Sequence, residues 1–264
     1  MPMLSLITGS GFYDIPELQQ REPVEVGNPF GPPVVVTTGT WHGVPIAFLG
    51  RHGSDHSVPP HAINFRANIF ALKEVGATSI LATAVSGGIA PEMEPGALVI
   101  ISDFLNFSSG RAVTFFDGSG LADGLAPDQS SGPVGVIHTD MSAAYDPDLR
   151  SLIAAAAEGE SISVIDGGVY CTTDGPRFET PAEIQMMKTM GGDLVGMTGY
   201  PEVALAVEAG LRYASIGVIS NLAAGISLDP LTVDDVVTLI KTTAEPLYRL
   251  IGATVGLYAQ SDLS

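Results

Sequence analysis

A cluster of cationic and imidazole side chains lies in the segment GRHGSDHS, at residues 50–57. Arg51, His52 and His56 fall within six residues, directly after an apolar run. The chain has only three lysines and eight arginines, so this is its densest cationic spot. A planar guanidinium beside imidazoles suits phosphate, and a solvated turn is the alternative. A metal site is less favoured, because only Asp55 lies close enough in sequence to complete a ligand set.

The turn TGSG at 8–11 follows the first apolar run and presents consecutive backbone N–H groups with the hydroxyl of Ser10. Such a turn can cradle an oxyanion, although a plain tight turn has the same composition. It does not match G-x-G-x-x-G, and the chain has no P-loop.

A single carboxamide, Asn221, stands among apolar and small residues in GVISNLAAGI, 217–226. A buried amide without partners costs about 1–3 kcal/mol. Either Asn221 caps a loop, or its missing partner is a ligand.

An aromatic ring and a carboxylate adjoin in TTDGPRFET, 172–180, between a predicted strand and a predicted helix. A purine can stack on Phe178 while its N1–H donates to Glu179. The competing interpretation places Phe178 in the core and Glu179 at a helix start, where acidic residues are favoured. The chain has no G-x-S-x-G elbow, paired C-x-x-C or H-E-x-x-H, so serine nucleophiles and zinc hydrolysis have no support.

Apolar runs alternate with helical patterns along the chain. Strands are predicted at 4–8, 32–41, 44–50, 78–85, 97–105, 161–172, 194–197 and 213–221, with the second and third paired as a hairpin. Helices are predicted at 64–75, 147–157, 180–190, 201–210 and 232–258. This alternation predicts an α/β fold with a mostly parallel sheet covered by helices on both faces.

Small or polar residues follow four of the predicted strands, namely Ser10, Ser86, Thr172 and Asn221. Ligands of such sheets bind beyond the carboxyl ends of the strands. The sequence therefore predicts that these residues gather at one edge of the sheet.

The composition is that of a globular protein with a large core and many tight turns. Of 264 residues, 45% are hydrophobic and 15% charged, with 31 glycines and 19 prolines. The length suits one large domain or two small ones, and the best candidate for a long loop is 115–131. A net charge of −18 disfavours nucleic-acid partners, which need clustered Lys and Arg. It also fits an adaptation of solubility to salt.

Membrane association is not expected, because no apolar run reaches the roughly 18 residues of a membrane span. The N-terminus also lacks the basic and apolar regions of a signal peptide. The single cysteine, Cys171, excludes internal disulfides, fits the cytoplasm and is expected to be a small buried hydrophobe.

Taken in chain order, these segments resemble the trimeric purine nucleoside phosphorylases, a family that includes methylthioadenosine phosphorylases. The resemblance runs nearly end to end and rests on TGSGFYDIPE, FLGRHG, PPHAINFRANIFALKEVG, SGGI with PGALVI, DGPRFET, GDLVGMTGYPEVALAVEAG and YASIGVISN. It implies a single domain over 1–264, with a mixed, mostly parallel central sheet flanked by helices. It also implies a cytoplasmic homotrimer, or a dimer of trimers, that acts in purine salvage.

The implied reaction is a phosphorolysis by a pentosyltransferase, in which phosphate attacks C1′ of a nucleoside and the purine leaves. Met197 matches the residue that meets the ribose, and Phe178 matches the ring beside the base. Inorganic phosphate is the co-substrate, and no metal or organic cofactor is implied. By position, the implied phosphate ligands are Ser10, Arg51, His52, Thr198 and the amide of Val85.

One segment departs from the family pattern. In TAVSGG, 83–88, Ala84 stands where relatives often have Thr or Asn, and Ser86 stands where Cys or Ala is usual. A side chain that contacts phosphate is therefore missing, unless Thr83 or Ser86 replaces it.

Two side chains decide the base that the resemblance implies. In the family that this chain resembles, members that cleave 6-aminopurine nucleosides have Asp at the positions of Asn221 and Ala223. They have Ser or a similar small residue at the position of Glu179. Hypoxanthine and guanine offer O6 as acceptor and N1–H as donor, which suit an Asn amide and a Glu carboxylate. Adenine reverses this pattern, so the site rejects it. Asn221 and Glu179 are therefore the predicted catalytic residues, with Asn221 stabilising the leaving purine.

The resemblance implies that the last predicted helix and a partner subunit together form the pocket for the 5′ end of the sugar. By this resemblance, Val233 stands at a position where ordinary 6-oxopurine phosphorylases have His. Enzymes that cleave methylthio-nucleosides have an apolar residue there. Val236 lies on the same stripe, and His138 matches a residue that trimers contribute across the subunit contact. An apolar wall favours a methylthio group by roughly 1–3 kcal/mol. Ordinary helix packing is the alternative for Val233.

The expected substrate is therefore S-methyl-5′-thioinosine, with inosine and guanosine also cleaved. A general inosine and guanosine phosphorylase and a methylthioadenosine phosphorylase with altered base contacts are alternatives. A nucleosidase that uses water and a nucleoside-binding protein without activity are two more. Phosphate dependence and relative rates on four nucleosides separate them.

Overall fold

The computed structural model describes residues 2–9, 15–53, 57–120, 125, 137–227 and 233–263, and of residues 233–241 it describes only the backbone. The strands are β1 (Met3–Thr8), β2 (Gln19–Asn28), β3 (Gly31–Trp41), β4 (Val44–Gly50), β5 (Ala77–Gly88), β6 (Leu98–Ile100), β7 (Asp103–Asn106), β8 (Val164–Asp166), β9 (Val169–Thr172), β10 (Leu194–Gly196) and β11 (Arg212–Leu222). The helices are η1 (Pro60–Ala62), α1 (Phe65–Glu74), α2 (Pro147–Gly159), α3 (Pro181–Thr189), α4 (Gly199–Glu208) and α5 (Val233–Tyr258).

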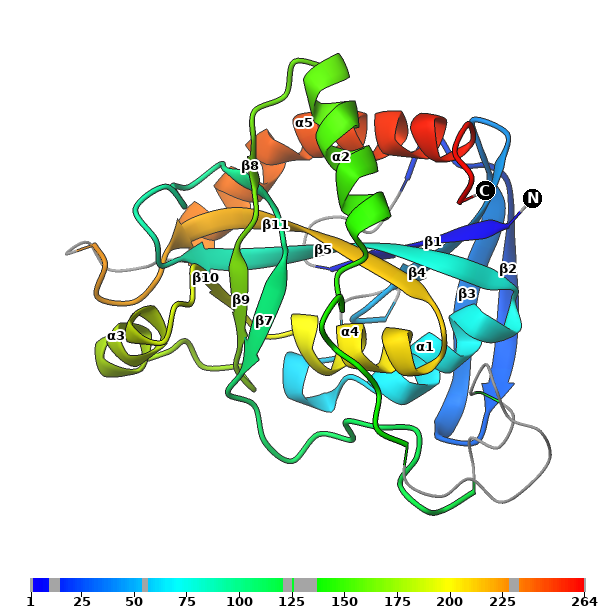
Figure 1. Ribbon diagram of the computed structural model, residues 1–264, viewed down its shortest axis with the longest axis horizontal. Helices are drawn as coiled ribbons and strands as arrows, with labels where there is room; N and C mark the ends of the chain where they lie inside the picture. Colours follow the sequence, from blue (N-terminus) through cyan, green and yellow to red (C-terminus); the bar gives the residue numbers. More distant parts are fainter. Residues whose placement is uncertain are drawn as a thin grey trace.

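The strands join in one branched sheet (Figure 1). Its main path runs β2-β3-β4-β1-β5-β10-β9-β7, and a second branch leaves β5 through β11, β6 and β8. β1, β4, β5 and β11 run parallel, as do β10, β9 and β7. β2 with β3, β3 with β4, β11 with β6 and β10 with β5 are antiparallel. The predicted mixed, mostly parallel sheet is therefore confirmed.

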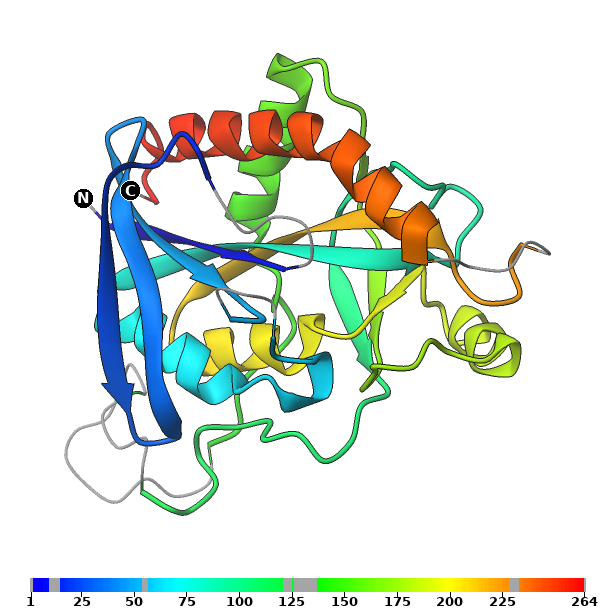
Figure 2. The same ribbon diagram turned by 180° about the vertical axis from the view of Figure 1, so that it is seen from behind.

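Helices cover both faces of this sheet (Figures 1 and 2). α2 and α5 lie over one face, and α1 and α4 lie over the other. Leu4 and Leu6 of β1 pack in the core beneath α2 and α5, whereas Ile7 packs in the core against α1 and α4. A strand that is buried on both faces needs apolar residues at successive positions, which explains the continuous apolar runs.

Two predicted strands are each divided in two. The run 97–105 gives β6 and β7, and the run 161–172 gives β8 and β9. β6 and β8 pair in the branch of β11, whereas β7 and β9 pair in the branch of β10. Both runs therefore cross between branches, and the second turns at Gly167, whose φ of +103° favours glycine. An apolar run does not reveal such a bend.

β2 is absent from the sequence prediction. Its residues, QQREPVEVGN, are mostly exposed, so no continuous apolar pattern marks the strand. It pairs with β3 alone at the end of the sheet path, where an edge strand tolerates Pro23.

Cys171 lies in a small core beside α3, with Ile184, Met187 and Val195. It is buried, as predicted, and burial raises the pKa of its thiol to about 12. The thiol is therefore protonated at neutral pH and is not a nucleophile. In the part of the chain that the structure describes, no helix combines the length and the apolarity that a membrane span requires.

Candidate active site

The carboxyl ends of several strands open onto one cavity of about 210 Å³. It is lined by residues at or just beyond the ends of β1, β4, β5, β10 and β11, and by the segment before α3. The end of β10 reaches this place because β10 runs antiparallel to β5, with Val195 opposite Gly87. Among the lining residues are Arg51, His52, Val85, Phe178, Glu179, Met197, Thr198 and Asn221, all of them predicted from the sequence.

Arg51 is buried and forms a two-pronged ion pair with Glu202 of α4. Nε donates to Oε2 at 2.6 Å, Nη2 donates to Oε1 at 2.8 Å, and Nη1 donates to the Thr83 carbonyl at 2.9 Å. The Tyr213 hydroxyl donates to the same carboxylate at 2.8 Å. Burial opposes the positive charge, but the attraction of Glu202 outweighs it and raises the pKa of Arg51. Three of the five guanidinium N–H groups are used, so the group is held firmly and keeps donors for an anion.

His52 lies beside Arg51 and is also buried. Its Nδ1 donates to the Val58 carbonyl at 2.8 Å, which fixes the plane of the imidazole. A side-chain carbon placed on Gly9 would lie 3.0 Å from Nη1 of Arg51 and 3.6 Å from Nε2 of His52. Gly9, which directly follows β1, therefore lies against both side chains, as a phosphate cradle requires. Ser10, the predicted hydroxyl ligand in this turn, lies outside the described residues.

The segment TAVSGG ends β5 beside the cavity. Of the two candidate replacements for the family's Thr or Asn, Ser86 lines the cavity, and its hydroxyl donates to the Ala84 carbonyl at 3.0 Å. That hydroxyl therefore has no second proton for phosphate. Among the described lining residues Thr83 does not occur. The amide of Val85 stays the predicted phosphate donor of this segment.

Met197 and Thr198 follow β10 and lead into α4. The backbone N–H of Thr198 donates to the Tyr170 hydroxyl at 3.4 Å. Four residues further on, Glu202 holds Arg51. One short segment thus carries the predicted ribose contact, a predicted phosphate ligand and the carboxylate that orients the arginine.

Glu179 precedes α3 but does not cap it. The Thr180 hydroxyl accepts from the Glu183 N–H at 3.2 Å, and the Glu183 carboxylate accepts from the Thr180 N–H at 2.7 Å. Oε1 of Glu179 instead accepts from the Thr173 hydroxyl at 2.6 Å. Glu179 therefore lies at the start of the helix, as the alternative interpretation expected, but one of its carboxylate oxygens binds Thr173 and the other keeps capacity for a ligand.

Asn221 is the last residue but one of β11, and its side chain uses half of its hydrogen-bonding capacity within the chain. Nδ2 donates to the Leu222 carbonyl at 2.9 Å, and Oδ1 accepts from the Ser220 hydroxyl at 2.7 Å. A carbonyl can only accept, so Leu222 decides the orientation of the amide. One N–H and one lone pair remain beside the cavity. Asn221 therefore bonds the strand end, and its contact with a ligand stays a prediction.

Phe178 is 49% exposed and lines the cavity. The interpretation of this ring as a core residue is therefore wrong. A ring at the edge of a cavity is free to stack on an aromatic ligand.

Two other predicted residues, Thr172 and His138, do not occur among the described residues that line the cavity. Thr172 is buried, and its hydroxyl accepts from the Tyr200 N–H at 3.2 Å, so it supports the loop after β10. His138 is exposed and does not occur among the described lining residues, so its predicted role requires a partner subunit. Val233 and Val236 begin α5, but their side chains lie outside the described residues.

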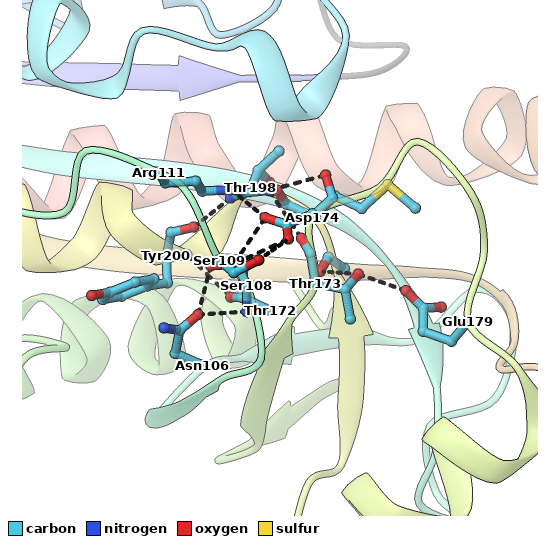
Figure 3. Close-up of polar contacts among 12 residues, drawn as sticks. Asn106, Ser108, Ser109, Arg111, Thr172, Thr173, Asp174, Glu179, Thr198 and Tyr200 are labelled. Atoms are coloured by element: carbon cyan, nitrogen blue, oxygen red, sulfur yellow. Dashed lines mark hydrogen bonds and ion pairs between the residues drawn. The ribbon is translucent and has the colours of Figure 1, made fainter.

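Sequence reasoning missed Arg111. Its side chain is 5% exposed, and it joins the loops that follow β9 and β10 (Figure 3). The available signal was compositional, because Arg111 is one of only eight arginines and lies in an otherwise uncharged segment, FSSGRAVTF. Within the described residues, no group of three His, Cys, Asp or Glu side chains is arranged to hold a metal ion.

Substitution of Gly175 by alanine is expected to raise the KM for nucleoside about 10-fold and to leave the KM for phosphate unchanged. Gly175 has a φ of +64°, and a side-chain carbon there would overlap the sulfur of Met197. The substitution therefore pushes Met197 away from the ribose, and a displacement of about 1 Å at a site costs up to roughly 100-fold. Steady-state kinetics on inosine with each substrate varied in turn provide the measurement.

The matched control for this prediction is Gly43→Ala. Gly43 has a similar φ of +78°, but a side-chain carbon there would meet nothing within 4 Å. Both variants carry the backbone strain of about 1–2 kcal/mol, and only Gly175→Ala displaces Met197. Equal kinetic effects in the two variants would contradict the role given to Met197.

Comparison with known proteins assigns the class. Residues 4–255 match the phosphorylase superfamily, so the chain belongs to that superfamily. It is 44% identical over 248 residues to a probable 6-oxopurine nucleoside phosphorylase of Moorella thermoacetica, covering 94% of this chain and 90% of that protein. It is 39% identical over 256 residues to a probable S-methyl-5′-thioinosine phosphorylase of Methanothermobacter thermautotrophicus, covering 96% and 83%.

The solved structures include a close match to the fold. Methylthioadenosine phosphorylase from Schistosoma mansoni, in complex with adenine, superimposes with a TM-score of 0.89 at 31% identity. The match covers 99% of this chain and 93% of that one. The family resemblance and the fold predicted from the sequence are therefore confirmed.

Proposed function

We propose that this protein is a pentosyltransferase that cleaves 6-oxopurine nucleosides by phosphorolysis, giving the purine base and a ribose 1-phosphate. The observation that carries the proposal is one cavity lined by two different sets of polar groups. Glu179 and Asn221 offer an acceptor and an amide donor, while Arg51 and His52 lie against Gly9, the residue that follows β1. The printed names of the Moorella and Methanothermobacter relatives support the same reaction class.

The base end suits a ring that carries a keto oxygen and an N1–H. Glu179 accepts N1–H, while the remaining N–H of Asn221 donates to O6 and its lone pair accepts from a protonated N7. The Thr173 hydroxyl holds one oxygen of Glu179 and so directs the other. Phe178 supplies a face for stacking. An adenine ring turns a lone pair toward Glu179, so the same site rejects it.

The phosphate end accounts for the chemistry. A phosphate oxygen forms the new bond to C1′ as the bond from C1′ to N9 breaks, and the electron pair of that bond stays on the purine. The negative charge of phosphate stabilises the positive charge that develops on the sugar. Arg51 holds the phosphate in place without losing its orientation, because Glu202 fixes the guanidinium. Asn221 stabilises the purine as negative charge reaches it.

The preferred 5′ substituent is methylthio, so S-methyl-5′-thioinosine is the first substrate and the sugar product is 5-methylthioribose 1-phosphate. Val233 and Val236, at the start of α5, supply the apolar wall. A general inosine and guanosine phosphorylase is the second candidate, favoured by the name of the Moorella relative. A homotrimer in the cytoplasm completes the proposal; in it, His138, which is exposed and is not among the described residues that line this subunit's cavity, is supplied to the cavity of a neighbouring subunit.

Four nucleosides test the proposal in one assay: inosine, adenosine and their 5′-methylthio forms, each with and without phosphate. Both 6-oxopurine nucleosides are expected to be cleaved only when phosphate is present. The adenine forms are expected to have a kcat/KM at least about 100-fold lower, because they leave Glu179 facing a lone pair. Methylthioinosine is expected to exceed inosine by roughly 10-fold, as burial of a methylthio group predicts.

Each alternative has its own outcome in this assay. Cleavage without phosphate would establish a nucleosidase, and faster cleavage of methylthioadenosine would establish the adenine-specific alternative. Binding without turnover would establish a nucleoside-binding protein. A preference for inosine over methylthioinosine would retain the reaction and refute the apolar 5′ wall.

A further inference from the structure

Arg111 links two loops of the site through backbone carbonyls. Nη1 donates to Tyr200 O at 2.7 Å, and Nη2 approaches Met197 O at 2.9 Å, Thr173 O at 2.9 Å and Asp174 O at 3.1 Å. Nε donates to the Asp174 carboxylate at 3.2 Å. Figure 3 shows the guanidinium between the segment 173–174, after β9, and the segment 197–200, after β10.

The two loops carry the predicted contacts to different parts of a nucleoside. Met197, whose carbonyl accepts from Arg111, is the predicted ribose contact. Thr173, whose carbonyl also accepts from Arg111, donates through its hydroxyl to Glu179, the predicted base contact. Arg111 therefore connects the loop of the predicted ribose contact to the loop whose Thr173 holds the predicted base contact, and it does not occur among the described residues that line the cavity.

The Arg111 guanidinium is held in place by its own partners. Asp174 also accepts from the backbone N–H and the hydroxyl of Ser109, two residues before Arg111, so the segment that carries the arginine is tied to the loop it binds. The arginine also lies over the ring of Phe65, with its central carbon 5.4 Å from the ring centroid. Burial lowers the pKa of Arg111, and Asp174 opposes that shift.

We propose that Arg111 is a positioning residue that sets the spacing between Met197 and Glu179, and thereby the affinity for the nucleoside. The inference rests on the proposed function, because it assigns ribose and base to these two side chains. Arg111 and Arg51 have no hydrogen-bond partner in common: Arg51 binds Glu202 and Thr83, whereas Arg111 binds the four loop residues. Loss of Arg111 therefore weakens nucleoside binding more than phosphate binding, because Thr198 is the one predicted phosphate ligand that lies in a segment held by Arg111.

The test compares Arg111→Lys and Arg111→Ala with the unchanged protein. Lysine keeps the positive charge, but its compact ammonium group cannot donate to carbonyls of both loops at once, as the planar guanidinium of arginine does. We expect the KM for inosine to rise about 10- to 100-fold in both variants, and the KM for phosphate, which depends on this segment through Thr198 alone, to rise at most about a tenth as much. Added guanidinium is expected to restore much of the inosine affinity of Arg111→Ala, which a general loss of folding would not allow.

Arg249→Ala is the matched control. Arg249 also donates to a carboxylate and a backbone carbonyl, both of Glu160, but its side chain is 46% exposed and it lies on α5. Both KM values are expected to stay unchanged in that variant.

Two results would overturn the inference. The first is an equal rise of the KM for inosine and the KM for phosphate. The second is an unchanged KM for inosine in Arg111→Lys. The unchanged protein decides the proposed function separately. If the unchanged protein does not phosphorolyse inosine, the proposed function is refuted, and this inference, which rests on it, is refuted as well. If it does, the variants decide the role of Arg111 alone.

Discussion

Substitution of Arg51 by methionine is expected to lower kcat/KM for phosphate at least about 100-fold and to destabilise the fold by roughly 3–5 kcal/mol. Both effects have one cause, because the substitution removes the predicted phosphate ligand and leaves the buried carboxylate of Glu202 without its cation. Phosphate-dependent cleavage of inosine measures the first effect, and denaturant unfolding measures the second.

A double variant, Arg51→Met with Glu202→Gln, separates these two effects. The glutamine carries no charge and still accepts from the Tyr213 hydroxyl, so no buried carboxylate is left unpaired. Removal of both charges of a buried pair is often nearly neutral for stability. We expect the double variant to regain most of the lost stability and none of the lost activity. Recovery of phosphate affinity in the double variant would show that Arg51 acts only by folding the site.

Substitution of Asn221 by aspartate is expected to lower kcat/KM for inosine about 100-fold and to raise the ratio of adenosine to inosine cleavage at least about 10-fold. A carboxylate repels the O6 of hypoxanthine, whereas it accepts from the N6 amino group of adenine. Oδ1 still accepts from Ser220, but the bond to the Leu222 carbonyl is lost. Competition between inosine and adenosine in one reaction gives the ratio directly.

Asn28→Asp is the matched control for this substitution. Asn28 also donates to a carbonyl, that of Pro32, and accepts from a neighbour, the N–H of Phe30, but it lies at the end of β2 away from the cavity. The Asn28→Asp substitution makes the same chemical change in a similar local pattern of hydrogen bonds. An unchanged adenosine ratio in Asn221→Asp would refute the role of the amide in base recognition. A changed ratio in Asn28→Asp would show that added charge alone alters selectivity.

The sequence by itself determined the local elements and the chemical character of the site. The apolar runs and helical spacing place β1, β5 and β11 and all five α-helices, because periodicity and turn residues are properties of a continuous segment. The same reasoning placed Arg51, Glu179 and Asn221 at segment ends, and parallel strands bring such ends together. The choice between Asn and Asp, or between Glu and Ser, is also visible in the sequence, since a donor or acceptor is a property of the residue type.

Only the tertiary structure decided which groups hold these residues. Glu202 pairs with Arg51 across 151 positions, and no local pattern identifies such a partner. The branching of the sheet at β5, which divides two predicted strands, depends on which strands pair and not on their composition. Arg111 is the clearest case, because it binds mainly to backbone carbonyls, and every residue has one. A hydrogen bond to a backbone carbonyl does not depend on the type of the accepting residue. Such a bond therefore cannot be predicted from the sequence and is seen only in the tertiary structure.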